Sequence, residues 1–195
     1  AIGLAVFNKV FSESMDVLNA FDESLASLSG KTGTVGKFND NLYDAQRAGN
    51  LLGVSMDDAA NSIVALNAGT SQFAKLNSKT RTDLVIASSQ MEKLGVAASD
   101  TADFMENAFK IMGMGATEAI EAQTELAMAG VQLGIGAGKI VKDFTAASKT
   151  LAVYGKGSMK VFKSLAAQAK AANVEVGTLL GIVEKFDTFS GAAEG

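Results

Sequence analysis

The chain contains no proline, yet short glycine phrases interrupt it at regular intervals. Three of them, LGVSMDDA, LGVAASDT and MGMGATEA, share an apolar residue, a glycine, an apolar residue, three variable residues and an acid. A glycine after an apolar helix end suits the position that ends a helix, and a hydroxyl a few residues later suits the next N-cap. The expected helix-ending glycines are Gly53, Gly95 and Gly113. The residues expected at or near the following N-caps are Ser55, Ser99 and Thr117.

Weaker copies of this phrase occur near positions 77, 134, 155 and 173, so the possible breaks follow one another at 18 to 24 residues. That interval is the length of one helix and its turn, which predicts helical hairpins that stack on one another. No stretch has the sustained apolar and polar alternation of a strand. We therefore expect an all-α fold in which 45–195 is compact or multiply bent, with some of the breaks being kinks.

The first 29 residues have a different pattern, with one seam of residues at strict three-four spacing. Its members are Leu4, Phe7, Phe11, Ser14, Leu18, Phe21, Leu25 and Leu28. This pattern predicts a coiled-coil-like helix over 1–29 that self-associates in parallel as a trimer, or else an amphipathic helix that faces the chain's own core. The helix is expected to stop at Ser29-Gly30, and 30–44 should form a glycine-rich connector and the start of the next helix.

Charge is distributed in two neighbouring blocks of opposite sign. Residues 98–128 sum to −5, whereas 139–170 sum to +6, from seven lysines and one aspartate. Five lysines recur every seven residues, namely Lys142, Lys149, Lys156, Lys163 and Lys170. In one continuous helix they would form a basic stripe opposite a second apolar seam, facing solvent, an acidic wall or a partner. Gly155 and Gly157 argue against perfect continuity and suggest that the stripe is split.

The phrase LGIGAGKIVK at 133–142 suggests a phosphate-binding loop, but the spacing excludes it. A P-loop requires a glycine five positions before Gly-Lys-Ser/Thr, whereas Leu133 precedes Gly138 at that distance and Ile140 follows Lys139. The triplet Gly30-Lys31-Thr32 fails as well, because Leu25 occupies the first glycine position. We expect the glycines of 134–138 to allow a sharp bend or a close approach of two helices instead.

Composition removes most catalytic chemistry, because the chain has no histidine and no cysteine. Imidazole bases, thiolate nucleophiles and His/Cys metal sites are therefore impossible. The net charge of −4 does not favour a general nucleic-acid binder. The uncharged run 126–138 has 13 residues, too short for a bilayer span of about 20 residues. We expect no enzyme, no cofactor, no metal and no small-molecule substrate, and a chain that begins at Ala1 is expected to be a piece of a longer protein.

Several phrases resemble the tail-length tape-measure proteins of tailed bacteriophages. They are LGVSMDDAANSIVALNAGTSQFAKL, AMAGVQLGIGAGKIVKDFTAASKTLAVYGKGSMKVFKSLAAQA and GIVEKFDTFSGAAEG, within 45–195. The resemblance implies a helical structural protein in the lumen of the tail tube or at the tail tip, present in a few copies. Its implied partners are other copies, tube subunits and baseplate or tail-tip proteins, and its length would set tail length.

Two departures from that family bear on function. Some members carry peptidoglycan-cleaving domains, but no pair of carboxylates here fits that chemistry. The family also tends to contain membrane-spanning stretches, which this chain does not have. The alternative class is a helical bacterial secretion or pore-forming protein, which would need a longer hydrophobic hairpin.

Overall fold

The computed structural model describes residues 2–181, and in the first helix it describes side chains at Lys9, Ser12 and from Asn19 onward. The described part is helical and contains no strand, which confirms the all-α class. The α-helices are α1 (Ile2–Thr32), α2 (Asn39–Gly49), α3 (Met56–Gly69), α4 (Ser78–Lys93), α5 (Ala98–Lys110), α6 (Ala116–Gln132), α7 (Ala137–Ala147) and α8 (Ser158–Ala171). Short 3₁₀ helices are η1 (Asn50–Leu52), η2 (Phe73–Lys75) and η3 (Thr150–Gly157).

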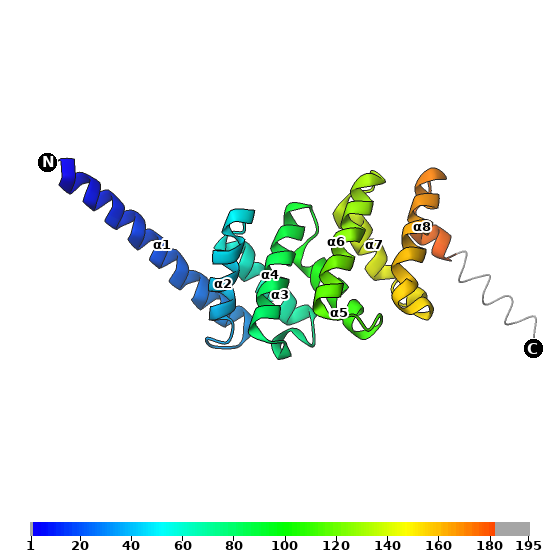
Figure 1. The fold of residues 1–195 in the computed structure, drawn as a ribbon, viewed down its shortest axis with the longest axis horizontal. Coiled ribbons are helices and arrows are strands. Elements are labelled where there is room, and N and C mark those ends of the chain that lie inside the picture. Colours follow the sequence, from blue (N-terminus) through cyan, green and yellow to red (C-terminus); the bar gives the residue numbers. More distant parts are fainter. Residues whose placement is uncertain (1, 182–195) are drawn as a thin grey trace, which may run out of the picture.

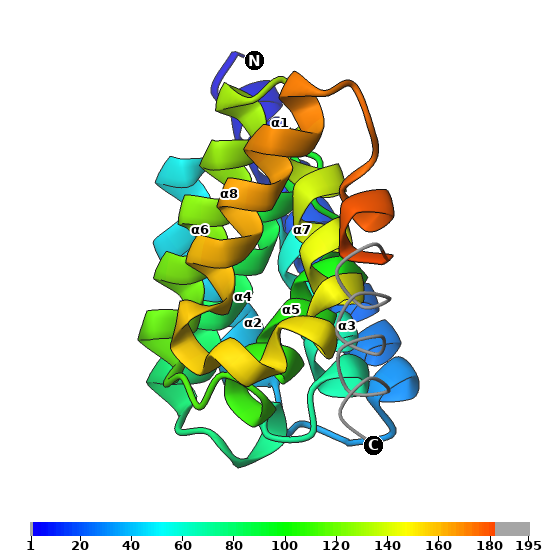
Figure 2. The same cartoon turned by 90° about the vertical axis from the view of Figure 1, so that its right-hand side faces the viewer.

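The helices form a two-layered stack of hairpins. Each helix packs against the one two places further along the chain, so α2, α4, α6 and α8 make one layer and α1, α3, α5 and α7 make the other. Figure 2 shows the two layers end-on, and Figure 1 shows the stack advancing with α1 projecting beyond its first end. From α2 onward, equivalent helices start 38 to 42 residues apart. One hairpin of about 40 residues is therefore the repeating unit, as the sequence pattern predicts.

The turns that divide the helices follow one backbone rule. Gly53, Gly95, Gly113 and Gly134 have φ between 63° and 84°, and Asn173 has φ 54°. This left-handed conformation ends a helix and is least costly for glycine. The breaks expected at these five positions are therefore confirmed.

A hydrogen bond closes the turn at several of these breaks. The N–H of Val54 donates to Gly49 O at 2.9 Å, and the N–H of Val96 donates to Met91 O at 3.0 Å. Both valines are buried, at 2% and 0% exposed. The apolar residue after the glycine thus locks the turn to the core, which is the Schellman arrangement of a helix end.

All three residues expected at or near an N-cap lie there, but only one of them is the cap itself. Ser55 caps α3, since its Oγ accepts from Asp58 N at 3.1 Å while Asp58 Oδ2 accepts from Ser55 N at 3.0 Å. Ser99 and Thr117 lie near the N-caps but are not the caps themselves, because the N-cap positions are Ala97 and Gly115, two residues earlier. Ala97 and Gly115 have extended backbone, and neither makes a side-chain capping hydrogen bond. Helices α5 and α6 therefore begin before Ser99 and Thr117 and without a side-chain cap.

The first helix also ends later than expected. It continues past Ser29-Gly30 to Thr32, and Gly33 takes the left-handed conformation with φ 65°. Thr32 Oγ1 donates to Leu28 O at 2.7 Å, which satisfies a carbonyl of the last turn. A glycine inside a helix is tolerated, at a cost of about 1 kcal/mol relative to alanine.

Two glycines of the 130–138 region allow helices to approach closely. A Cβ on Gly138 would lie 2.1 Å from the carbonyl oxygen of Gly95. A Cβ on Gly130 would lie 2.4 Å from Cγ2 of Ile140. Helix α6, not a strand, precedes this segment, so the rejection of a phosphate-binding loop is confirmed.

The core runs along the stack as a chain of aromatic contacts between successive repeats. Phe104 of α5 lies 5.6 Å from Phe144 of α7, and Phe144 lies 5.2 Å from Phe162 of α8, measured between ring centroids. At the other end, Phe38 and Phe73 are 5.6 Å apart. All five rings are at most 1% exposed, so each repeat completes the core of its neighbour.

We predict that Gly138→Ala destabilises the protein by about 1 to 3 kcal/mol or more, because the new methyl group would overlap backbone that cannot rotate away. Urea unfolding followed by circular dichroism measures this change. Gly30→Ala is the matched control, since Gly30 lies in a helix with nothing within 4 Å of its added Cβ. That control should be neutral or stabilising by up to about 1 kcal/mol. Equal effects of the two substitutions would contradict the close approach.

Candidate functional site

The apolar seam of α1 is divided between described and undescribed side chains. At its C-terminal end Leu28 is 2% exposed in the chain's own core, and Leu25 packs partly against that core. Phe21 contacts Tyr43 of α2 edge-on, with ring centroids 6.4 Å apart. This end of the seam therefore follows the intramolecular alternative. The side chains of Leu4, Phe7, Phe11, Ser14 and Leu18 lie outside the described residues, and self-association through them stays a prediction.

The five stripe lysines do not lie on one helix. Lys142 is on α7, Lys149 follows α7, Lys156 lies in η3, and Lys163 and Lys170 are on α8. The chain is not continuous here, because Gly155 has φ 51° and ψ −127° inside η3. The five lysines therefore do not form the single outward-facing stripe expected for one continuous helix. The split suggested by Gly155 and Gly157 is confirmed.

Two of the lysines contact α6 and a third contacts the turn that follows it, and we call these three contacts the charged ladder. Lys156 Nζ lies 2.8 Å from Glu118 Oε1, Lys163 pairs with Glu125, and Lys170 Nζ donates to Gly134 O at 3.3 Å. Both ion pairs join residues 38 positions apart, and both partners advance by seven residues. Helices α6 and α8 therefore run parallel, in a register set by the seven-residue spacing of both sets of charges. The glutamates that these lysines face belong to the acidic block of 98–128.

The hydrogen bond from Lys156 lowers the pKa of Glu118 below its ordinary value. Lys142 and Lys149 remain exposed and make no ion pair with another described residue. The stripe is thus divided between three lysines that serve the fold and two that face solvent.

A cleft of about 530 Å³ lies between α6 and α8 beside the charged ladder. Met114, Ala122 and Met159 line its apolar part. Glu121 and Lys160 also line the cleft, and neither pairs with another described residue. Helices α6 and α8 therefore meet through charges around a hollow rather than through continuous apolar packing.

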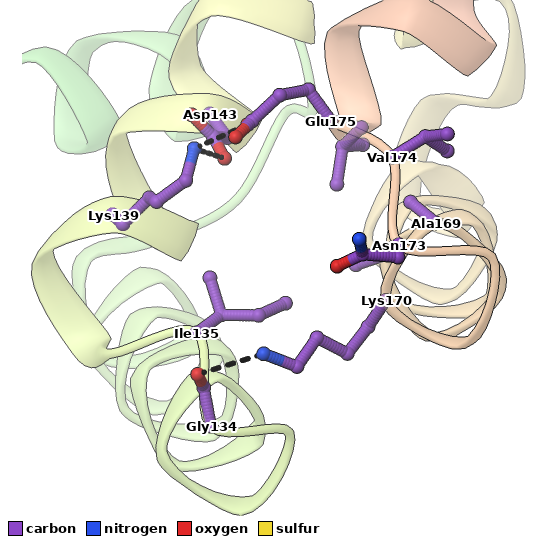
Figure 3. Close-up of a pocket in the computed structure, with 11 residues that line it drawn as sticks. Gly134, Ile135, Lys139, Asp143, Ala169, Lys170, Asn173, Val174 and Glu175 are labelled. Atoms are coloured by element: carbon purple, nitrogen blue, oxygen red, sulfur yellow. Dashed lines mark hydrogen bonds and ion pairs between the residues drawn. The ribbon is translucent and has the colours of Figure 1, made fainter.

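A second hollow, of about 300 Å³, lies where α6, α7 and α8 meet the segment after α8 (Figure 3). Lys139 Nζ lies 2.8 Å from Asp143 Oδ2 and 2.8 Å from Glu175 Oε2. Lys139 Nζ donates hydrogen bonds to both carboxylates, and these bonds, to Asp143 first and then to Glu175, raise the pKa of Lys139 above its ordinary value. The pairing ties the segment after α8 to α7, so these charges already have a structural role.

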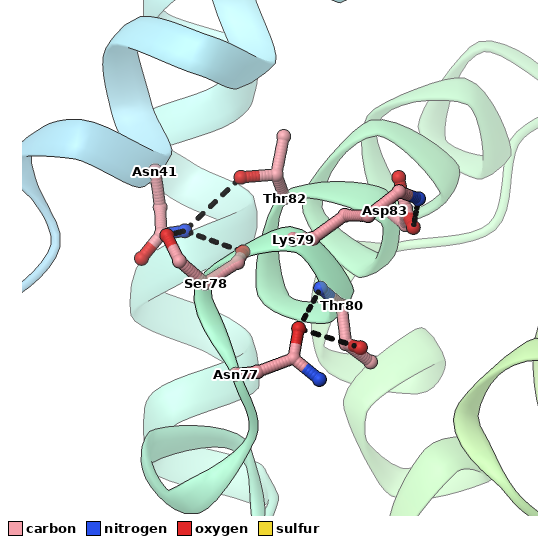
Figure 4. Close-up of polar contacts among 7 residues, drawn as sticks. All are labelled: Asn41, Asn77, Ser78, Lys79, Thr80, Thr82 and Asp83. Carbon is pink, nitrogen blue, oxygen red and sulfur yellow. Dashed lines mark hydrogen bonds and ion pairs between the residues drawn. The ribbon is translucent and has the colours of Figure 1, made fainter.

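A buried polar cluster joins α2 to α4 (Figure 4). Asn41 is fully buried, and its Nδ2 donates to Ser78 O, Ser78 Oγ and Thr82 Oγ1 at 2.9 to 3.1 Å. Its Oδ1 accepts from Arg81 Nε at 2.8 Å. Sequence analysis missed this cluster, because the asparagine in FNDNLYD has no spacing signal that separates it from its exposed neighbours.

Among residues 2–181, no group of three or more acidic side chains is placed to hold a metal ion. In the same range no helix combines the length and apolar character needed to cross a bilayer. Comparisons with protein-family models, with curated proteins and with solved structures find no match. The interaction surfaces of the stack are therefore the candidate functional features.

We predict that Asn41→Leu lowers the free energy of unfolding by about 1 to 3 kcal/mol, because the Arg81 Nε–H and the buried Thr82 hydroxyl lose their partner. Asn61→Leu is the matched control, since Asn61 is exposed on α3. Chemical denaturation of both variants measures the difference. Similar small effects at both sites would show that the cluster does not stabilise the α2–α4 contact.

Proposed function

We propose that this chain is a structural segment of a bacteriophage tail tape-measure protein, which acts in tail assembly inside the tail tube or at its tip. The tape-measure-like phrases of 45–195 support this proposal. A second support is the architecture, a stack of helical hairpins with a long projecting helix (Figure 1). Its partners would be other copies of the chain and the tail-tube and baseplate proteins.

The geometry of the repeat is the observation that supports a position near the tail tip. A continuous helix of 40 residues would extend about 60 Å, at about 1.5 Å per residue. A stacked hairpin of about 40 residues advances by one helix-to-helix distance, about 8 to 10 Å. For the same number of residues, the described stack is therefore much shorter than a continuous helix and presents more surface. We therefore place this segment near the tail tip, where it docks to other proteins.

The docking role can be separated from a measuring role by deletion of residues 39–171 in the phage that encodes this chain. If these residues form a docking stack, tails that assemble should be shortened by less than about 50 Å, and fewer should assemble. If these residues instead measured length as one helix, tails would shorten by about 200 Å. Electron microscopy of purified particles measures both quantities.

Mass spectrometry of those particles provides the control for the class of protein. The chain should copurify with tail-tube and baseplate proteins. Its absence from tails would overturn the tape-measure proposal, and recovery with bacterial membranes would favour the secretion or pore-forming alternative.

We also propose that the projecting part of α1 associates with α1 of other copies as a parallel trimer. The undescribed side chains continue the three-four seam beyond the part that packs on the chain's own core. A helix with one apolar seam is stabilised by burying that seam against a neighbour. Cyclic symmetry would also suit a chain that lies along the axis of a tube.

Sedimentation of the full chain tests this association, and we predict a trimer. Phe11→Asp should give a monomer, because burying an unpaired carboxylate in the seam costs several kcal/mol. Ser12→Asp is the matched control, since Ser12 is exposed on the same helix. A wild-type chain that stays monomeric at high concentration would contradict the trimer, as would an oligomer that survives Phe11→Asp.

A further inference from the structure

We propose that α8 is a movable arm whose contact with α6 is controlled by ionic strength. In low salt the charged ladder holds α8 in register on α6, and in high salt α8 separates from α6 while it remains attached to α7. This salt-dependent contact lies in the last described hairpin and does not depend on the proposed function.

Helix α8 has two interfaces of different chemistry. Toward α7 it is apolar, with fully buried Phe162 edge-on to Phe144 at 5.2 Å between ring centroids. Toward α6 it has the charged ladder and the open cleft of about 530 Å³. Apolar contacts are little affected by moderate salt, whereas exposed ion pairs are screened. Salt therefore acts selectively on the α6 side.

The lateral contact between α2 and α4 has a different chemistry. Each of these helices has a buried leucine, Leu42 or Leu84, and the satisfied polar cluster of Asn41 joins them. Helices α2 and α4 are in extensive contact, whereas α4 with α6, α6 with α8 and α7 with α8 touch more sparsely. Among the described residues an ion pair joins α6 to α8, and none joins α2 to α4.

The ladder is accessible to dissolved ions. The side chains of Lys156 and Glu118 are 61% and 44% exposed, and those of Lys163 and Glu125 are 27% and 65% exposed. An exposed pair of this kind contributes little on its own, and the contribution falls as salt rises. Lys156 lies in η3, two residues before α8, and Lys163 lies on α8, so the two pairs hold the entry to the helix and the helix itself in one register on α6.

The connection into α8 provides a pivot. Gly155 has φ 51° and ψ −127°, a conformation that side chains other than hydrogen disfavour. The Ser158 Oγ at the start of α8 lies 2.7 Å from Leu151 O and 2.6 Å from Gly155 O. The start of α8 is therefore pinned, while Lys163 and Lys170 hold the rest of the helix laterally.

Hydrogen exchange of the full chain, read by mass spectrometry, tests the proposal. Between about 0.01 M and about 1 M sodium chloride the Debye length falls from about 30 to about 3 Å. Exchange of the α8 amides should accelerate severalfold over this range, while exchange of α4 amides stays constant. If α8 exchange is unchanged by salt, or if α4 accelerates equally, the proposal is overturned.

Substitutions identify the ladder as the cause. The double variant Glu118→Gln with Glu125→Gln should exchange fast at α8 in low salt and lose the salt response. Glu121→Gln is the matched control on the same helix, because Glu121 makes no ion pair with a described residue, and it should keep the wild-type response. Exchanging the charges, with Glu118→Lys and Glu125→Lys on α6, Lys156→Glu in η3 and Lys163→Glu on α8, should restore slow exchange. A charge exchange that fails to restore it, while α4 keeps its protection, would overturn the ladder.

Discussion

The rest of this structure depends on the repeated interruption of an otherwise strong helix former. A left-handed residue after each of several helices turns the chain back, and the apolar residue behind it is buried in the core. The backbone hydrogen bonds of the helix end are then satisfied within the turn, so no capping side chain is required on that side. Because each hairpin exposes an apolar face, its burial requires the next hairpin, and a stack follows.

Close stacking in turn depends on residues that have no side chain at the crossing points. At Gly138 the backbone of α7 approaches the carbonyl of Gly95 in the preceding repeat, which no other residue type permits. The aromatic rings of Phe104, Phe144 and Phe162 then meet across successive helices. Packing between repeats is thus set by glycines at the turns and aromatic side chains in the middle of the helices.

The sequence predicts the local features of this fold better than the long-range ones. Breaks at Gly53 or Gly95 are readable because a backbone requirement selects a residue type at a fixed place in a phrase. The direction of Lys163 is not readable, since a heptad of lysines has the same spacing whether it faces solvent or a neighbouring acidic helix. The buried role of Asn41 is harder still to predict from the sequence, because its partners lie 37 to 41 residues away and have no pattern of their own.

A stack of this kind has a consequence for how its ends behave. Each repeat contacts only its neighbours, so opening an end breaks one interface whereas opening the middle breaks two. In the described chain the α8 end joins α6 through screened charges and joins α7 through apolar packing. The α1 end instead anchors Leu28 in the core and extends the remaining helix outward. The two ends therefore differ in physical character, because one responds to the ionic medium and the other projects a helix that a neighbouring molecule can bury.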